Sequence, residues 1–365
     1  MPLNYISYFR DYSNENKSLF LNDKIGLLDT INKKHVDIWN MYKLLKSLDW
    51  DELEVNYSSC KAEFKSLDKE LSDIMIYTLA WQWEADSSAS MISSILMPFI
   101  SSTELVAYIA ELSKNEILHS ITYSEIVKNS FDNPDEVITK MLSIKESFAR
   151  LETVSKNFDE FYTLSHNYAL GNIDKNDTIL KKGIIKFFIT ILCLERVQFM
   201  PSFVITFGMA EIGNFLPIAK IVQKICNDEF QVHVQTDKLI LSNELNTVEG
   251  LSVFISIMDE VQLIIKEIVE QELTWIDYLY KDKNMLLNIS KKDIRNFVIY
   301  SVTDIYTFLN LDNPYGNITV NPLPFMNKWI NINSNQASPQ EENVVNYLLG
   351  GFIDDEKKTN LQLTF

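Results

Sequence analysis

Glu116 and His119 stand three residues apart in a segment whose apolar residues recur at helical spacing. Residues three apart project from the same face of an α-helix. A carboxylate and an imidazole presented together in this way bind metal ions in helical bundles. Tyr123 follows His119 by four residues, one helical turn or roughly 6 Å along the same face. The segment therefore predicts a metal site with a tyrosine beside it.

Further acidic side chains interrupt apolar stretches elsewhere in the chain. Asp86 precedes a run of small and apolar residues, and Glu195 follows an apolar run over 189–194. An isolated carboxylate is costly to bury, so each must be paired, protonated or bound to a metal ion. A second carboxylate–imidazole pair lies near residue 230. The predicted ligands are Asp86, Glu116, His119, Glu195, Glu229 and His233.

The spacing of these ligands fits two helical hairpins. Asp86 precedes Glu116 by 30 residues and Glu195 precedes Glu229 by 34, with one break in the helical pattern inside each pair. Two such hairpins form a bundle with a dinuclear site at its centre. Carboxylate and imidazole ligands suit iron or manganese better than metals that prefer thiolates. The alternative is a set of ordinary buried salt bridges and core histidines, which is our interpretation of His35 and His166.

Composition points to an all-α protein. Only nine glycines and nine prolines interrupt 365 residues, and apolar and charged residues alternate with helical period. A net charge of −17 argues against binding to nucleic acid or to an anionic membrane surface. The three cysteines, at positions 60, 193 and 226, are unequally spaced and fit free thiols in a reducing cytoplasm.

No segment has the features of a membrane anchor or a secretory signal. Residues 1–5 lack a basic start and an apolar run, and the most apolar window, 187–207, contains Glu195, Arg196 and Gln198. Charge at the centre of a lipid-exposed helix is costly, so we interpret that window as a buried core helix.

The helical pattern predicts one helical domain over residues 1–332, with a variable segment over 1–20, and a polar, flexible tail over 333–365 that a partner orders. We expect a bend near Gly208 and Gly213, and a kink or a helix end at Pro201. The predicted helices span residues 23–46, 66–97, 102–129, 134–170, 181–207, 210–241, 247–281 and 291–309.

These motifs resemble the radical-bearing small subunit of class I ribonucleotide reductase, nearest the aerobic bacterial and phage type. The resemblance runs from about Phe20 to the C-terminus. It rests on the predicted ligands, on the spacing from Glu116 to Tyr123, and on two tail segments, 338–341 and 347–350. It implies a ferritin-like bundle that holds two iron ions in a diiron-oxo centre, with manganese as a second choice of metal.

The resemblance also implies roles for individual residues. Dioxygen reacts at the centre and Tyr123 becomes a stable radical, in an apolar pocket formed by Phe199, Phe203 and Ile225. A large subunit receives the oxidising equivalent, docks the last residues, 360–365, and reduces ribonucleotides. The family further implies a homodimer. The radical-transfer path falls on His119, Asp228, Trp50, Glu341 and Tyr347.

One feature departs from the family pattern. The second pair is usually Glu-x-x-His, whereas Glu229 and His233 are four apart, which still shares a face and which a single π-type bulge can accommodate. Two rival functions are a ferritin-like diiron oxidase or oxygenase that acts directly on a small substrate, and a metal-free helical scaffold. Tyr123 and the tail argue against the first, and six intact ligands argue against the second.

Overall fold

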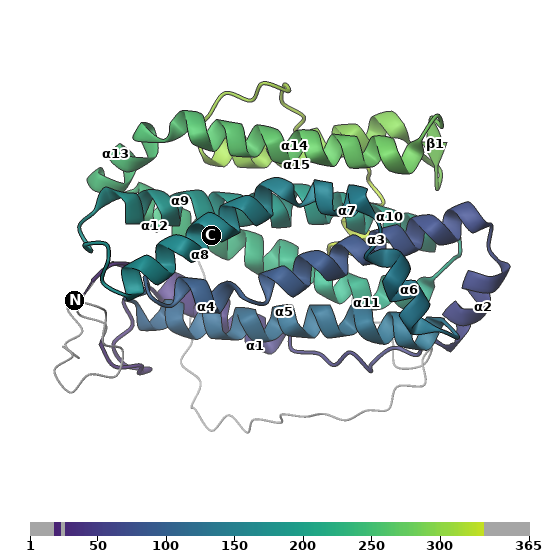
Figure 1. Ribbon diagram of the computed structural model, residues 1–365, viewed down its shortest axis with the longest axis horizontal. Helices are drawn as coiled ribbons and strands as arrows, with labels where there is room; N and C mark the ends of the chain where they lie inside the picture. Colours follow the sequence, from purple (N-terminus) through teal and green to yellow (C-terminus); the bar gives the residue numbers. More distant parts are fainter. Residues whose placement is uncertain (1–17, 23–25, 332–365) are drawn as a thin grey trace, which may run out of the picture. The chain divides into compact units, whose positions relative to one another are not determined.

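The computed structural model describes residues 18–22 and 26–331, and these form a helical body (Figure 1). The predicted all-α class is confirmed. Within the described residues the only strands are β1 (Met285–Leu286) and β2 (Ile289–Ser290), which pair antiparallel before the last long helix. Residues 332–365, including the predicted tail, lie outside the described part of the chain.

The helices follow one another closely along the chain. Two of the helical segments, η1 and η2, are π-helical, and each continues directly into its α-helical neighbours. The bounds are α1 Val36–Ser47, α2 Ser58–Ser66, α3 Lys69–Ala89, α4 Ile92–Leu96, α5 Thr103–Ser130, α6 Pro134–Met141, α7 Lys145–Arg150, α8 Glu152–Ala169, α9 Thr178–Cys193, η1 Leu194–Phe199, α10 Met200–Glu211, α11 Leu216–Asn227, η2 Asp228–His233, α12 Val234–Leu245, α13 Val248–Ser256, α14 Met258–Tyr280, α15 Lys291–Phe308 and α16 Met326–Trp329.

Four long helical runs surround the centre of this body. α3 packs on α5, α9 packs on α12, and η1 contacts η2. In Figure 1, α14 and α15 run along one side and α1 and α5 along the opposite side, with the α9–α10 run between them. The two predicted hairpins therefore meet where α3, α5, η1 and η2 come together.

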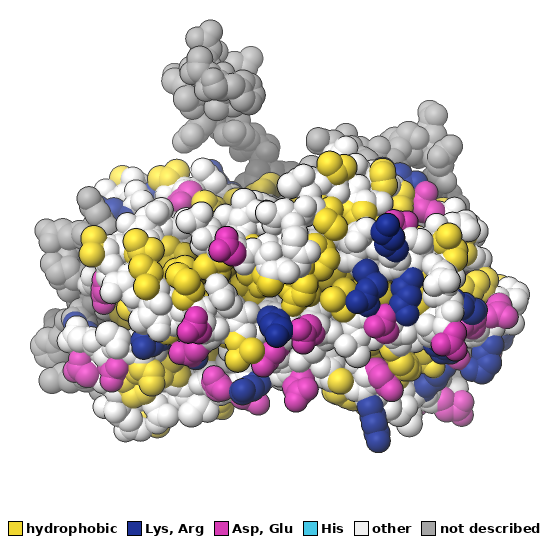
Figure 2. Space-filling model, turned by 90° about the horizontal axis from the view of Figure 1, so that it is seen from above, with side chains coloured by type: hydrophobic (Ala, Val, Ile, Leu, Met, Phe, Trp, Pro, Cys, Tyr) yellow, Lys and Arg dark blue, Asp and Glu magenta, His cyan; other side chains and the backbone are white. Residues whose placement is uncertain are grey.

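The central run is mostly apolar. The 34-residue stretch Thr178–Glu211 is long and apolar enough to cross a membrane by composition, but its whole apolar window is buried inside the body. It serves as the core helix that the sequence predicts. Figure 2 shows one outer face, on which apolar side chains lie between interspersed acidic and basic ones.

Polar side chains fix where several helices begin. Ser102 accepts a hydrogen bond from the backbone N–H of Leu105, and Asp68 accepts one from the backbone N–H of Glu70. Such N-caps satisfy backbone donors that have no partner inside the helix and stabilise it by about 1 kcal/mol. They place the starts of α5 and α3 and hence the register of the site residues on both helices.

The first predicted helix, residues 23–46, is too long at its start. The described residues 26–35 are not helical, and α1 begins at Val36. Gly26 has a positive φ of 76°, and Asp29 accepts the backbone N–H groups of Ile31 and Asn32, both at 2.6 Å. An aspartate that binds its own following backbone favours a turn over a helix.

Serine hydroxyls bind backbone carbonyls where two other predicted helices break. The helix expected over 66–97 breaks at Ser90, whose hydroxyl donates to the carbonyl of Ser87 at 2.8 Å. The helix expected over 134–170 is three helices, and Ser143 donates to the carbonyl of Lys140 in the first break. Hydroxyls that bind nearby carbonyls compete with the helix, and the apolar periodicity does not reveal this.

The predicted bend lies at Gly213 rather than at Gly208. Gly213 has a φ of 87° in the turn between α10 and α11, whereas Gly208 lies inside α10. A Cβ at Gly208 would come within 3.0 Å of Ile289, so that glycine permits close packing instead of a turn. Pro201 is the second residue of α10, immediately after the π-helical segment, where the regular α-helical hydrogen-bond pattern is already interrupted.

A buried ion pair fastens α7 and α14 to the segment that carries Glu195. Arg150 donates to both carboxylate oxygens of Glu272, at 2.6 and 2.8 Å, and both side chains are fully buried. Arg150 also donates to the carbonyl oxygen of Gln198 in η1 at 2.6 Å and lies 3.6 Å over the ring of Trp81. One guanidinium thus supports a carbonyl of the π-helical turn as well as the ion pair.

Removing Arg150 should destabilise the body strongly. Arg150→Met leaves Glu272 buried without a counter-charge, which costs about 3–5 kcal/mol in comparable sites. Burial raises the pKa of Glu272 to about 7 even with Arg150 present. Because a raised folded-state pKa disfavours the charged form, the deficit in unfolding free energy should be larger at pH 8 than at pH 5.

Urea unfolding at both pH values measures this effect. The double variant Arg150→Met/Glu272→Leu is the control, because it removes both charges and should recover much of the lost stability. A double variant as unstable as Arg150→Met alone would contradict the role given to the unpaired carboxylate.

Candidate metal centre

The structure brings all six predicted ligands together in the centre of the body. Asp86 comes from α3, Glu116 and His119 from α5, Glu195 from η1, and Glu229 and His233 from η2. Their ligand atoms form two groups, each within 4.8 Å: Asp86, Glu116, His119 and Glu229, and Glu116, Glu195, Glu229 and His233. Every member is at most 2% exposed.

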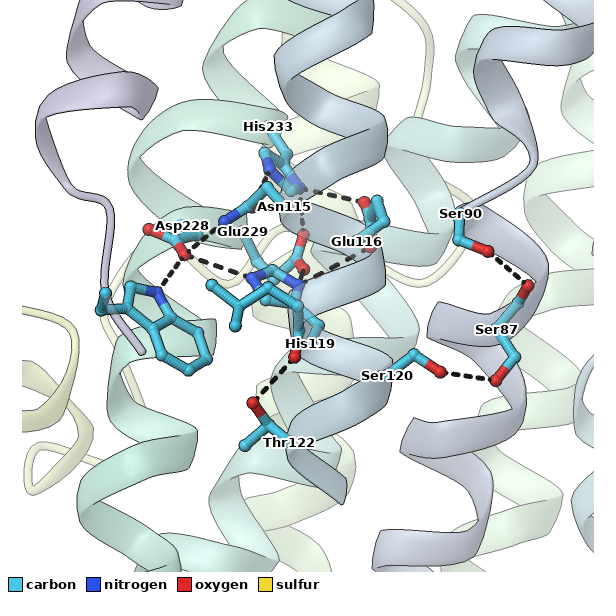
Figure 3. Close-up of polar contacts among 12 residues, drawn as sticks. Ser87, Ser90, Asn115, Glu116, His119, Ser120, Thr122, Asp228, Glu229 and His233 are labelled. Carbon is cyan, nitrogen blue, oxygen red and sulfur yellow. Dashed lines mark hydrogen bonds and ion pairs between the residues drawn. The ribbon is translucent and has the colours of Figure 1, made fainter. Parts of the chain in front are cut away.

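Glu116 and Glu229 belong to both groups and span the distance between the two histidines (Figure 3). Nδ1 of His119 lies 2.9 Å from Oε1 of Glu229 and 3.6 Å from Oε2 of Glu116. Nδ1 of His233 lies 2.6 Å from the other oxygen of Glu229 and 3.3 Å from the other oxygen of Glu116. Each glutamate therefore directs one oxygen toward each imidazole, which is the arrangement of a carboxylate that bridges two metal ions.

A π-helical turn resolves the unusual spacing of the second pair. Glu229 and His233 are the second and last residues of η2. A π-helix pairs residue i with i+5, so its wider turn lets residues four apart face the same point. The predicted bulge is thus present. A second one, η1, carries Glu195, and no insertion in the sequence pattern revealed it.

Burial and mutual repulsion disfavour ionisation of three of the carboxylates. Burial raises the pKa of Asp86 well above its ordinary value, and the charge on Glu116 adds to the effect. The pKa values of Glu116 and Glu195 rise for the same reasons, with Glu229 as the neighbouring charge. Without a cation, this cluster can hold its carboxylates only by binding protons.

Within the chain, the positive charge of the two protonated imidazoles compensates the negative charge of the carboxylates. Burial alone would lower the pKa of His233, but Glu229 raises it to about 8. Burial disfavours the charged form of His119. Contacts with Asp228, Glu116 and Glu229 favour that form, and they raise the pKa of His119 well above its ordinary value. Burial raises the pKa of Glu229, whereas the two histidines lower it. The histidines have the larger effect, so the pKa of Glu229 lies below its ordinary value.

The donor set fits a pair of metal ions. Both carboxylate oxygens of Asp86 and Oε2 of Glu195 have no hydrogen-bond partner among the described residues. Buried polar atoms without partners are rare and costly in folded proteins. Carboxylate oxygens and imidazole nitrogens at the meeting point of four helical segments are the ligands of dinuclear carboxylate centres.

Hydrogen bonds outside the cluster connect it to Trp50. Oδ2 of Asp228 accepts from Nε1 of Trp50 at 2.8 Å and lies 3.2 Å from Nε2 of His119. The rings of Trp50 and His119 stack with centroids 5.9 Å apart. Trp50 is 8% exposed, in the loop between α1 and α2. The contacts thus run from the cluster to a residue near the surface.

Asn115 is the site residue that the sequence analysis missed. Its amide nitrogen donates to Oδ2 of Asp228 at 3.0 Å, and its amide oxygen lies 2.9 Å from Nε2 of His233. Its position four residues before His119 places it on the ligand-bearing face of α5, a signal that the sequence does carry. A neutral amide carries no charge, so it does not stand out in an apolar segment as a buried carboxylate does.

Tyr123 lies beside the cluster and is fully buried. Burial raises the pKa of its phenol well above the ordinary value, and Asp86 and Cys226 add to the rise. Cys226 follows Ile225, so this end of α11 is close to Tyr123. Phe199 and Phe203 are also fully buried, and their rings stack 5.8 Å apart. Glu341 and Tyr347 lie outside the described residues.

Comparison with known proteins identifies the family. A family model described as ribonucleotide reductase, small chain, matches residues 29–322. The chain belongs to this family. The beta subunit of ribonucleoside-diphosphate reductase from Buchnera aphidicola subsp. Schizaphis graminum is 26% identical over 362 residues, covering 95% of this small chain and 96% of the relative.

Solved structures share the fold of this small chain. The ribonucleotide reductase R2 subunit from Clostridium botulinum superposes with a TM-score of 0.77 at 15% identity, covering 90% of this chain and 99% of that one. The dimanganese(II)-NrdF of Streptococcus sanguinis superposes with a TM-score of 0.62 at 16% identity, covering 81% and 96%. Together with the buried cluster, family membership assigns a dinuclear metal site and a large-chain partner to this small chain.

The two groups of ligands predict distinct losses on substitution. Asp86→Ala and His233→Ala should each leave one tightly bound ion, because each removes a ligand from one group. Glu116→Ala should weaken both ions, because Glu116 belongs to both groups. Manganese(II) titration, followed by electron paramagnetic resonance of the free ion, measures the stoichiometry of the small chain and its variants.

Glu84→Ala is the matched control for this titration. Glu84 lies on α3 two residues before Asp86 and contacts Ser147 rather than the cluster. It should keep two ions per chain. Glu116→Ala with one ion bound as tightly as in the unaltered chain would contradict a bridging role.

Proposed function

We propose that this chain is the small subunit of a ribonucleoside-diphosphate reductase and stores an oxidising equivalent at Tyr123 for a large subunit. One observation carries the proposal: a buried tyrosine and a tryptophan–carboxylate–imidazole contact flank the same dinuclear ligand cluster. The named relative from Buchnera aphidicola, a beta subunit of this reductase that aligns with this chain over 96% of its own length, supports it. A direct oxidase or oxygenase is not favoured, because Trp50 and Tyr123 would have no role in its reaction.

Two metal ions held by the six ligands would supply, in a reaction with dioxygen, the oxidant that takes one electron from Tyr123. Loss of an electron from a phenol releases its proton, and Asp86 is the neighbouring carboxylate. Full burial keeps water and external reductants from the resulting phenoxyl group. The apolar pocket proposed around it consists of Phe199, Phe203 and Ile225.

Trp50, Asp228 and His119 form the proposed path for the electron that returns to the site. Asp228 accepts hydrogen bonds from both rings, so it holds them at fixed separation and can share a proton with either. The path continues, in the proposal, through Glu341 and Tyr347 in the tail over 333–365, whose last residues, 360–365, dock on the large subunit. A homodimer of small subunits completes the assembly.

The ligand set suits both iron and manganese. We propose two iron ions as the resident metals, with two manganese ions as the alternative, because one solved relative is a dimanganese(II) protein. The three cysteines are buried free thiols, in keeping with a cytoplasmic location.

Tyr123→Phe should abolish the radical and leave metal binding intact, because phenylalanine keeps the ring and removes the oxidisable hydroxyl. Low-temperature electron paramagnetic resonance is recorded on protein loaded anaerobically with ferrous iron, then exposed to oxygen. The control is Tyr108→Phe, another fully buried tyrosine of α5, which should keep the tyrosyl signal. An unchanged radical yield in Tyr123→Phe would refute the assignment.

Tyr347→Phe should retain the tyrosyl radical and stop nucleotide reduction with the large subunit, because it removes a hydroxyl that the path requires and leaves Tyr123 and the six ligands unaltered. The measurement combines radical yield with turnover in the reconstituted complex. Tyr162→Phe, on the exposed side of α8, is the control and should turn over normally. Normal turnover by Tyr347→Phe would remove that residue from the path.

A further inference from the structure

We infer that Asn115 is a positioning residue whose single amide group holds both metal-binding imidazoles, His233 directly and His119 through Asp228. The inference rests on the proposed function in taking the two histidines as metal ligands. Asn115 is 7% exposed, and both ends of its amide have a partner inside the site (Figure 3). It therefore links the outer contacts of both groups of ligands.

The orientation of the amide follows from its neighbours. An ionised carboxylate accepts hydrogen bonds and donates none, and Oδ2 of Asp228 lies 3.0 Å from one end of the amide. That end must be the NH₂ group, because the carbonyl oxygen would repel the carboxylate. The carbonyl oxygen of Asn115 then faces Nε2 of His233 at 2.9 Å.

This orientation fixes the tautomer of His233. A carbonyl oxygen only accepts, so Nε2 of His233 must carry the hydrogen. The lone pair of the neutral ring then lies on Nδ1, which faces Glu229 and Glu116 inside the cluster. Metal-bound histidines need this kind of outer acceptor, which sets both the tautomer and the angle of the ring.

The other end of the amide acts on His119. Oδ2 of Asp228 is close to three donors: Trp50 at 2.8 Å, Asn115 at 3.0 Å and His119 at 3.2 Å. The donor from Asn115 helps to hold the carboxylate in place, and the carboxylate in turn orients His119 with Nδ1 toward the cluster. Both imidazoles thus present Nδ1 inward, and one side chain contributes to both orientations.

Histidine nitrogen spectroscopy tests the inference directly, because the chain contains only four histidines. Protein labelled with ¹⁵N-histidine is loaded with zinc, a diamagnetic ion that accepts the same nitrogen and oxygen ligands. In the unaltered chain, His119 and His233 should each show a metal-bound Nδ1 and a protonated Nε2. The interpretation of His166 as a core histidine is wrong, because His166 is exposed, and it serves here as the internal reference.

Asn115→Leu removes both hydrogen bonds while keeping a side chain of similar size. The Nε2–H signal of His233 should shift and exchange with water faster, and metal binding should weaken about 10–100-fold, the usual cost of losing such a partner. Asn115→Ala, which adds no bulk, repeats the test if the leucine variant does not fold. Unchanged histidine signals and unchanged affinity in the folded variant would overturn the inference.

Asn227→Leu is the matched control. Asn227 is also buried, precedes Asp228, and has no hydrogen-bond partner for its amide among the described residues. It should bind metal like the unaltered chain, and an equal loss in both variants would also overturn the inference by showing a general packing effect. An unaltered chain that binds no zinc would instead refute the metal site of the proposed function, so the two failures are distinguishable.

Discussion

The burial of four carboxylates among apolar helices is the constraint on which the rest of the molecule depends. Even with both imidazoles protonated, Asp86, Glu116, Glu195 and Glu229 carry an excess of negative charge in a medium that solvates it poorly. Only cations or bound protons can make that arrangement stable. The long capped helices, the buried apolar window of the α9–α10 run and the ion pair of Arg150 build a frame rigid enough to keep these groups from separating.

Within that frame, polar contacts are arranged in successive layers. The glutamates and histidines contact one another, Asp228 and Asn115 hold the histidines from outside, and Trp50 contacts Asp228 from near the surface. The carboxylates at the centre repel one another because they are charged. The surrounding groups, which are neutral or singly charged, set the orientation of the histidines through hydrogen bonds. The same contacts that orient the histidines also connect the centre with the exterior.

The sequence predicted which side chains meet at the centre of the body better than it predicted the helix boundaries. Acidic residues inside apolar stretches have few explanations, so Asp86 and Glu195 could be expected in a buried cluster without a structure. The start of α1 and the break at Ser90 depend on local hydrogen bonds that apolar periodicity does not encode. The π-helical turn η1 and the role of Asn115 depend on which atoms meet across helices, which spacing along one chain cannot specify.

The π-helical turns also bear on how the chain can change in evolution. Each accommodates one residue more than a regular helix over the same rise. Deleting a single residue from η2 would therefore restore an ordinary helical turn and leave the helices on either side in phase. The face of α12 that packs on α9 would keep its direction. The same deletion in a regular α-helix would turn everything after it by about 100°, the rotation per residue. A π-helical turn is therefore a place where the chain can lose one residue without changing the packing of an entire helix.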